Sequence, residues 1–383
     1  MAVMAVERGS ILLKCRAHPI LTRCAGAEGL PRIANHLRAT RSPSDPVHPA
    51  GRIFPTTMSH AQPAQLSEFD LIRRYFTRPV RKAALGVGDD CALIEGRPGH
   101  HLAISTDMLV SGRHFFPDMA PRALGHKALA VNLSDLAAMG AEPRAFTLAL
   151  ALPEADPAWL AELADGMLAL ADAHGCELVG GDTTRGPLTL SLTVFGDVPL
   201  RAALRRDAAR PGDDIWISGT LGDARLALGD CRGEWLLPEP EFSQVRPRMD
   251  TPTPRVALGM ALRGMAHAAL DISDGLVGDL GHILERSQVG ALVDVDALPR
   301  SAVLAGQPDA IQRECVLAGG DDYELCFTAP AGNRDAIAAI SERLALPLTR
   351  VGAITPEPGL RLVDGAGNPT RYEGASFDHF AAP

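Results

Sequence analysis

The chain has 383 residues, 46% of them hydrophobic and 22% charged, and a formal net charge of −9. This length exceeds one ordinary hydrophobic core and predicts two globular domains, while the acidic balance argues against nucleic acid or an anionic membrane as a main partner. Seven cysteines without a C-x-x-C pair argue against a disulfide framework or a zinc site, and no apolar run reaches the ~20 residues of a membrane helix, so we expect a cytoplasmic protein.

Residues 1–58 differ from the rest of the chain. They hold eight Lys and Arg against three Asp and Glu and show neither a helical nor a strand period. The composition resembles a transit peptide, but the missing amphipathic pattern favours an upstream start codon, with Met58 as the true first residue. We interpret residues 1–60 as a basic, irregular extension, and we expect removal of residues 1–58 to leave activity and stability unchanged.

Regular elements begin near residue 66. In chain order, spacing and capping residues predict a helix starting at 67–72, a strand over 101–110, a helix over 121–140 ended by Gly140, a strand over 146–152, a helix over 157–174 closed by Gly175, and strands over 177–179 and 188–198. Pro211-Gly212-Asp213 then interrupts the pattern. We expect one α/β domain over 61–199 and a second over 200–383.

Two short motifs recur in the second half. Asn132-Leu133-Ser134-Asp135 is matched by Asp271-Ile272-Ser273-Asp274, and Leu178 to Asp182 is matched by Leu317 to Asp321, with 45 residues from the aspartate to the first glycine in both halves. Equal order and spacing predict an internal duplication, hence two related α/β halves whose acidic loops face each other across a cleft.

Aspartates next to Gly, Ser or Thr are the distinctive chemical feature. They occur in Gly88-Asp89-Asp90, Ser105-Thr106-Asp107, Ser134-Asp135, Gly181-Asp182 and Asp271-Ile272-Ser273-Asp274. Mg²⁺ binds a few carboxylates together with substrate phosphates, so several such motifs predict a site with several Mg²⁺ ions. Helix capping or a turn explains any one motif equally well, but explains all five together poorly.

The segment Gly180–Gly186 is the strongest candidate for a phosphate-binding loop, because adjacent glycines let backbone N–H groups approach a phosphate. A P-loop is excluded, since the chain has no G-x-x-x-x-G-K-[ST] motif and only three lysines, Lys14, Lys82 and Lys127. The sequence around His114, taken alone, favours a hydrogen-bonded histidine over a catalytic one. No general base is needed if the nucleophile is a phosphate, which is already mostly dianionic at neutral pH.

Six motifs together resemble the thiamine-monophosphate kinase family. They are Gly86–Leu93, Ile104–Asp107, His114-Phe115, Lys127–Gly140, Gly180–Gly186 and Asp322–Phe327. The resemblance covers residues 66 to 380. Single motifs are shared with the wider aminoimidazole-ribonucleotide-synthetase-like superfamily, whereas the full ordered set is typical of the kinase.

The resemblance implies direct transfer of the ATP γ-phosphoryl group to thiamine monophosphate, which gives thiamine diphosphate and ADP. It also implies a homodimer whose N-terminal sheets pair across the two-fold axis, with the active site in the cleft between the two α/β domains. The residues that it implies as Mg²⁺ ligands are Asp90, Ser105, Thr106, Asp107, Asp135, Asp182, Asp271 and Asp274. Those implied for ATP are Gly181, Asp182, Arg206 and Ser273, and those for the substrate are His114, Asp321 and Phe377. The implied Mg²⁺ ligands agree with the interpretation of the Asp motifs given above. The roles of Arg206 and Phe377 rest on the resemblance alone.

Two alternatives stay open, and one position departs from the family. Another ATP-dependent superfamily member, of the ribonucleotide cyclo-ligase or selenophosphate synthetase type, would share single motifs, and a non-catalytic Mg-nucleotide-binding regulator would share the fold. The family usually has Glu where this chain has Asp321. The side chain is one methylene shorter there, which affects the reach of the substrate contact.

Overall fold

The computed structural model describes residues 68–87 and 91–372. Its helices are α1 (Glu68–Leu71), the π-helical turn η1 (Ile72–Phe76), α2 (Pro121–Ala138), α3 (Pro157–His174), α4 (Asp223–Cys231), α5 (Glu239–Asp250), α6 (Val256–Ala261), α7 (Leu276–Ser287), α8 (Ala302–Ala305), α9 (Asp309–Ala318), the 3₁₀ turn η2 (Ala331–Asn333) and α10 (Arg334–Leu344). Its strands are β1 (His100–Val110), β2 (Glu142–Leu152), β3 (Glu177–Arg185), β4 (Thr189–Pro199), β5 (Asp213–Ser218), β6 (Ala268–Asp271), β7 (Gly290–Asp294), β8 (Leu325–Pro330), β9 (Leu348–Thr355), β10 (Gly359–Val363) and β11 (Pro369–Thr370). None of these helices is long and apolar enough to cross a membrane.

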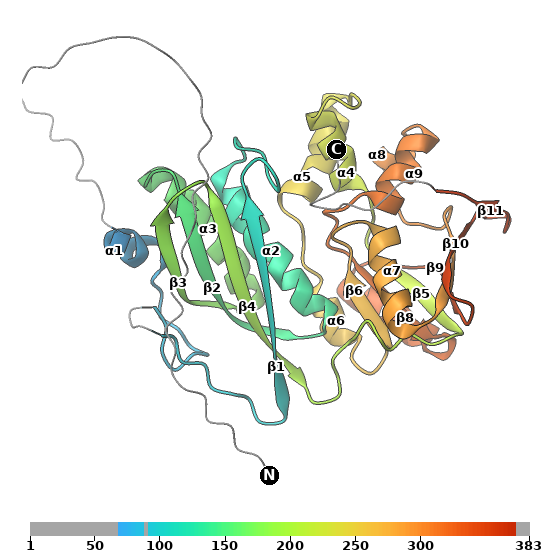
Figure 1. The fold of residues 1–383 in the computed structure, drawn as a ribbon, viewed down its shortest axis with the longest axis horizontal. Coiled ribbons are helices and arrows are strands. Elements are labelled where there is room, and N and C mark those ends of the chain that lie inside the picture. Colours follow the sequence, from blue (N-terminus) through green and yellow to red (C-terminus); the bar gives the residue numbers. More distant parts are fainter. Residues whose placement is uncertain (1–67, 88–90, 373–383) are drawn as a thin grey trace, which may run out of the picture. The chain divides into compact units, whose positions relative to one another are not determined.

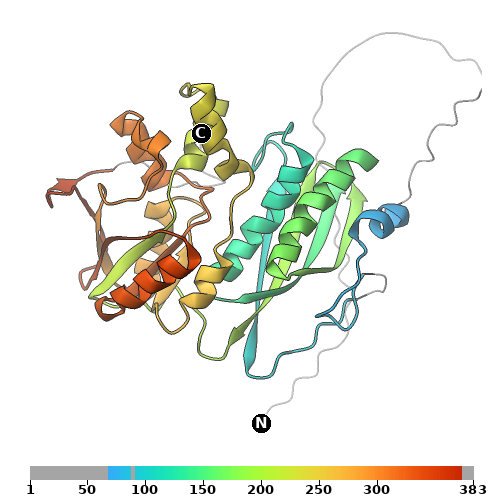
Figure 2. The same cartoon turned by 180° about the vertical axis from the view of Figure 1, so that it is seen from behind.

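The first sheet has four strands in the order β1-β4-β2-β3, with only the β2–β3 pair parallel. Helices α2 and α3 lie against one face of this sheet, and the other face carries no described element (Figures 1 and 2). The two helices pack closely, because a Cβ on Gly166 would stand 1.9 Å from the carbonyl oxygen of Arg122. Strand β1 and helix α3 match their predicted ranges to within a residue. Strand β3 continues six residues beyond the predicted 177–179.

The second sheet has seven strands in the order β11-β10-β7-β9-β5-β8-β6. Only β10 and β7 run parallel, and the other neighbours are antiparallel. Helices α4, α5, α7 and α9 accompany this sheet in the yellow and orange part of Figure 1. The fold is therefore two α/β units with mixed sheets, as the fold class predicted.

The repeated motifs do not occupy equivalent structures. Asp135 lies inside helix α2, whereas Asp274 lies in the turn between β6 and α7. Likewise Asp182 lies in strand β3, whereas Asp321 lies in the loop between α9 and β8. Equal spacing in the sequence thus does not carry over into equal local structure, although Asp135, Asp274 and Asp321 line one cavity.

The first hydrophobic cluster joins the two sheets. It contains Phe146 and Leu129 from the four-stranded side and Trp216 and Phe327 from the seven-stranded side. The second cluster, around Ile215, lies within the seven-stranded side. Helix α2 is buried around most of its circumference, because it packs on α3, on its sheet and on α6. This explains how a helix can carry site residues in a fixed place between the two halves.

A buried carboxylate holds the segment after α9. Glu324 is completely buried, and its carboxylate accepts from Arg248 at 2.6 Å, from Arg255 Nε at 2.6 Å and from the Ser218 hydroxyl at 2.5 Å. A buried charge is tolerated only when it is paired and hydrogen-bonded, as it is here. The Asp322–Phe327 motif is therefore partly structural, because it anchors the loop that carries Asp321.

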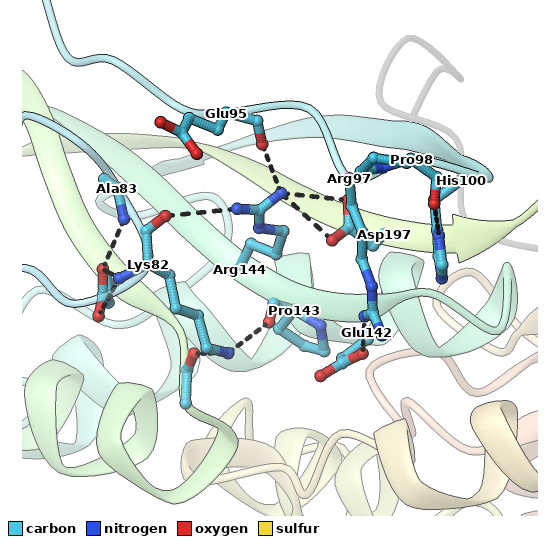
Figure 3. Close-up of polar contacts among 12 residues, drawn as sticks. Lys82, Ala83, Glu95, Arg97, Pro98, His100, Glu142, Pro143, Arg144 and Asp197 are labelled. Carbon is cyan, nitrogen blue, oxygen red and sulfur yellow. Dashed lines mark hydrogen bonds and ion pairs between the residues drawn. The ribbon is translucent and has the colours of Figure 1, made fainter.

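Polar contacts tie the segment before β1 to the first sheet (Figure 3). The Arg144 guanidinium donates to the carbonyl oxygens of Glu95 at 2.8 Å and Lys82 at 3.3 Å and pairs with Asp197 at 3.3 Å. The Lys82 ammonium donates to the carbonyl oxygen of Gly175 at 2.6 Å. These contacts hold Lys82 and Glu95 against the first sheet and its neighbouring helix cap.

Candidate active site

A cavity of about 920 Å³ collects half of the predicted site residues. It is lined from both halves of the fold, by strand β1, helix α2 and the loops after β6 and α9. The predicted residues on its wall are Asp107, His114, Asp135, Asp271, Ser273, Asp274 and Asp321. Apolar and aromatic side chains line it as well, among them Phe115, Phe116 and Tyr372. The cavity can therefore hold a ligand that has both a phosphate and aromatic rings.

A second cavity, of about 630 Å³, lies on the other side of two of these aspartates. Asp135 and Asp271 line both cavities, and Ser105 and Arg206 line only the second. Arg205, His282 and Arg286 add further basic groups to the wall. Cationic side chains beside carboxylates fit a polyphosphate whose charge is shared between protein cations and metal ions.

Hydrogen bonds between β1 and α2 position the first two aspartates. The Ser105 hydroxyl donates to the Asp135 carboxylate at 2.5 Å. The backbone N–H of Asp107 donates at 3.1 Å to the side-chain oxygen of Asn132, whose amide in turn donates to the carbonyl oxygen of Ala128. Asn132 is fully buried, so this contact fixes the register of α2 against the strand.

The turn between β6 and α7 is held by Asp279, which sequence reasoning missed. One oxygen of its buried carboxylate accepts the backbone N–H groups of Ser273, Asp274 and Gly275, each at 3.1 Å. The carbonyl oxygen of Ser273 accepts from the N–H of Asp321 at 2.8 Å. Ser273 lines the larger cavity, and both of its backbone polar groups are used internally. A ligand contact at Ser273 would therefore be made by the hydroxyl.

His114 has a defined tautomer. Its Nδ1 accepts the backbone N–H of Val110 at 2.9 Å, so the neutral ring carries its proton on Nε2. This ring is a hydrogen-bond donor on the cavity wall. The contact also explains why a histidine directly after β1 keeps a fixed orientation.

Three predicted residues lie elsewhere on the first sheet. Asp182 is exposed on β3, beside Ala149 of β2, and lines neither cavity. Its neighbour Gly181 is required by the strand, because a Cβ there would stand 1.9 Å from the carbonyl oxygen of Leu148. Thr106 points its hydroxyl at that of Thr193, at 2.8 Å, on the uncovered face. The predicted phosphate loop 180–186 is thus mostly strand, and one chain does not bring Asp182 to the other carboxylates. Asp90 and Phe377 lie outside the described residues.

Comparison with known proteins assigns the family. The N-terminal domain of AIR synthase related proteins matches residues 88–198, and the C-terminal domain matches residues 210–365. The thiamine-monophosphate kinase of Salmonella typhimurium is 47% identical over 323 residues, which cover 82% of this chain and 99% of that protein. The chain belongs to the thiamine-monophosphate kinase family.

Solved structures of the family share the fold. The thiamine-monophosphate kinase of Stenotrophomonas maltophilia is 50% identical, with a TM-score of 0.71 over 76% of this chain and 92% of that one. AaThiL, solved in complex with AMPPCP and TMP, is 30% identical, with a TM-score of 0.64 over 75% of this chain and 89% of that one. The six motifs thus led to the correct family.

The carboxylates at the shared wall fit divalent cations. Burial raises the pKa of Asp107 to about 6, helped by the charges of Asp135 and Asp274. Burial also raises the pKa of Asp271, and the Asp135 charge adds to it. Carboxylates this close together repel one another when ionised, and a bound cation would relieve that repulsion. Carboxylates are also hard oxygen donors, which are the ligands that Mg²⁺ prefers.

The protein supplies only part of such a coordination shell. Within residues 68–87 and 91–372, no group of three His, Cys, Asp or Glu side chains is placed to hold a metal ion by itself. This suits Mg²⁺, which keeps several waters and binds through one or two carboxylates plus substrate phosphates.

Two further residues of this thiamine-monophosphate kinase family member escaped the sequence reasoning. Lys127 of α2, almost fully buried, forms an ion pair with Asp321 on the cavity wall. Tyr323 lines the same cavity, and burial followed by the charges of Asp321 and Asp107 raises its pKa well above the ordinary value. The sequence offered one sign that Lys127 has a specific role. Lysine is rare in this Arg-rich chain, so a lysine within one of the motifs is unusual.

Proposed function

We propose that this chain transfers the γ-phosphoryl group of ATP to the phosphate of thiamine monophosphate, which yields thiamine diphosphate and ADP. The observation that carries the proposal is the pair of cavities that share Asp135 and Asp271. The cavity with Arg206 suits the nucleotide polyphosphate, and the larger one, with Asp321 and aromatic side chains, suits the thiamine end. AaThiL was solved in complex with both AMPPCP and TMP, which supports a site that takes two such ligands together.

The chemistry follows from the charges. An oxygen of the substrate phosphate, already mostly dianionic at neutral pH, attacks the γ-phosphorus as the bond from that phosphorus to the β-γ bridging oxygen breaks. No base is required, so the residues align two anions and offset their repulsion. Bound Mg²⁺ supplies charge neutralisation at the phosphate oxygens.

We propose the following division of labour among the residues. Metal ligands are Asp90, Ser105, Thr106, Asp107, Asp135, Asp182, Asp271 and Asp274; nucleotide contacts are Gly181, Asp182, Arg206 and Ser273; and substrate contacts are His114, Asp321 and Phe377. For Ser105 the contact with Asp135 supports a role at the metal, since its hydroxyl already orients that carboxylate. For His114 the fixed tautomer supports donation from Nε2 to the substrate.

We also propose a homodimer built on the uncovered face of the first sheet. Ile104, Met108 and Leu102 on β1 are 59%, 57% and 47% exposed there, a row of apolar side chains. Asp182 lies on the same face, three strand spacings or about 14 Å from β1. A sheet-to-sheet dimer covers the apolar row and gives Asp182 a route to an active site that one chain does not provide.

We propose a cytoplasmic location and a division into domains 61–199 and 200–383. The thiols of Cys91, Cys176, Cys231, Cys315 and Cys326 are all free, which agrees with a reducing compartment. The first sheet ends at Pro199 and the second begins at Asp213, which supports a boundary near residue 200. Cell fractionation and limited proteolysis test these two assignments.

The experiment is an acceptor panel. Purified protein with MgATP is offered thiamine monophosphate, thiamine, aminoimidazole-type ribonucleotide precursors and selenide, while ADP and the phosphorylated product are quantified. We expect ADP and thiamine diphosphate in equal amounts, with thiamine monophosphate only. Stimulation by another acceptor would assign the chain another activity of its superfamily. Nucleotide binding without stimulation by any acceptor would point to a regulator.

A further inference from the structure

Lys127 is a buried cation at the edge of the larger cavity. It is one of three lysines in the chain, and its side chain is 3% exposed. Removing an ammonium from water carries a large penalty unless partners compensate it. A buried lysine therefore needs specific partners that compensate its charge, and the contacts of Lys127 identify them.

Both partners of the Lys127 ammonium come from the other half of the fold. The ammonium forms an ion pair with the carboxylate of Asp321 and donates to the carbonyl oxygen of Met249 at 2.8 Å. Met249 lies in the last turn of α5, where carbonyl groups lack a partner inside the helix. Lys127 thus joins α2 to the end of α5 and to the loop after α9.

The backbone of Asp321 is already fixed before Lys127 acts on its side chain. Asp321 has φ +69°, in the left-handed region, and its N–H donates to the carbonyl oxygen of Ser273 at 2.8 Å. Its side chain is 30% exposed and lines the cavity. With the main chain set, the direction of the carboxylate depends on the side chains that hold it: Lys127 holds Oδ2, and the Tyr323 side chain also hydrogen-bonds to Asp321.

We propose that Lys127 is a positioning residue for substrate recognition, which rests on the proposed function. Its ammonium holds one oxygen of Asp321 and cancels much of that carboxylate's charge, so that the other oxygen faces the cavity as an oriented hydrogen-bond acceptor. Asp321 then recognises a donor such as the aminopyrimidine group, and does not serve as a free counter-charge for the thiazolium ring. The pair also gives the short Asp a fixed reach where the family usually has Glu.

A double-mutant cycle tests whether Lys127 acts through Asp321. Steady-state kinetics are measured for wild type, Lys127→Met, Asp321→Asn and the double variant. We expect Lys127→Met to raise KM for thiamine monophosphate by about 10- to 100-fold, the range of one charged hydrogen bond, and to leave KM for ATP within about 3-fold. In the Asp321→Asn background the same change should alter KM by less than about 2-fold.

His126 supplies the matched control. It precedes Lys127 on α2, and its Nε2 donates to the carbonyl oxygen of Pro252 at 2.8 Å, but it lines neither cavity. His126→Leu removes a comparable contact between the halves without touching Asp321. We expect it to lower the unfolding temperature and leave both KM values unchanged.

Three results would overturn the proposal: the same KM increase in both Asp321 backgrounds, a parallel increase in KM for ATP, or no increase at all. If Lys127→Met does not fold, Lys127→Arg takes its place in the same cycle and is judged by the same criteria. Wild-type protein that makes no thiamine diphosphate refutes the proposed function instead. The cycle is then read from calorimetric binding of thiamine monophosphate.

Discussion

The loops of the seven-stranded half and the open face of the four-stranded sheet hold site residues in opposite ways. In the loops, Asp279 gathers three backbone N–H groups, and the Asp321 loop is bonded to the carbonyl oxygen of Ser273. On the open face, Asp182 is exposed and Leu102 is 47% exposed. The loops are held by contacts within their own chain, whereas no described helix or strand covers the open face.

This difference separates two kinds of functional position. A residue whose support comes from its own chain is ready before any ligand arrives, and its mutation should act on ligands directly. A residue on an uncovered face depends on association, so its mutation should act through protein concentration as well. The proposed dimer and the proposed metal site can therefore be tested separately.

The largest effect is expected at the metal wall. Asp274→Asn removes one negative charge from the loop that Asp279 holds, so we expect turnover to fall by about 100- to 1000-fold and the Mg²⁺ concentration for half-maximal rate to rise. Asp135→Asn should behave alike. Asp364→Asn, in a turn outside both cavities, is the control. A wild-type rate and Mg²⁺ midpoint in either variant would remove that residue from the metal ligands.

The open face should respond differently. Leu102→Glu places a charge on the surface proposed to pair and outside both cavities, and we expect the dimer to weaken by about 100-fold or more, because that charge would be buried without a partner. Analytical ultracentrifugation measures the dissociation constant, and activity should fall with dilution. Leu236→Glu, at a position 89% exposed elsewhere, is the control. A variant that stays dimeric would show that another surface forms the interface.

The support of the metal loop can be weakened without touching a proposed ligand. Asp279→Asn keeps an acceptor oxygen but loses the charge that three N–H groups share. We expect the Mg²⁺ midpoint to rise by about 10- to 100-fold, the usual effect of altering residues behind a metal ligand. Calorimetry with Mg²⁺ and an ATP analogue gives the binding constant apart from turnover. An unchanged constant would mean that the turn holds its shape without Asp279.

Sequence patterns were sufficient for those features that depend on local chemistry. The strand over 101–110 and the helix over 157–174 were predictable from side-chain period and from Gly175 as a left-handed cap, which the structure confirms at φ +58°. The grouping of Asp107, Asp135, Asp271 and Asp274 on one cavity wall was also predictable, since several motifs with Asp next to Gly, Ser or Thr are typical of a cation site.

Features that depend on contacts between distant segments were not predictable. Gly180–Gly186 resembles a flexible loop in sequence, yet pairing with β2 makes most of it a strand. Lys127 and Asp321 are 194 residues apart, and no local pattern marks either as the partner of the other. Asp279 reads as an ordinary residue of a helix's first turn, and only the folded turn before it shows what it binds.

The smallest effect concerns how stability changes with pH, and it arises from the buried carboxylate of Asp107 on the cavity wall. Burial, with the charges of Asp135 and Asp274, raises the pKa of Asp107 from 3.8 to about 6. Between these two values the folded protein binds a proton that the unfolded chain releases, so stability falls as pH rises and levels off above about 6. For one such group the loss between pH 5.5 and pH 7.5 is about 1 kcal/mol. Urea unfolding without Mg²⁺ should show a decrease that is smaller by this amount in Asp107→Asn, whose side chain does not ionise, than in wild type. Burial also raises the pKa values of Asp271 and Asp279, and these two groups contribute to the decrease in both proteins. Because Mg²⁺ binds the ionised carboxylates, its stabilising effect should be larger at pH 7.5 than at pH 5.5. An equal pH dependence in both proteins would mean that Asp107 ionises as readily in the folded chain as in the unfolded one, and that the wall is not short of positive charge at β1.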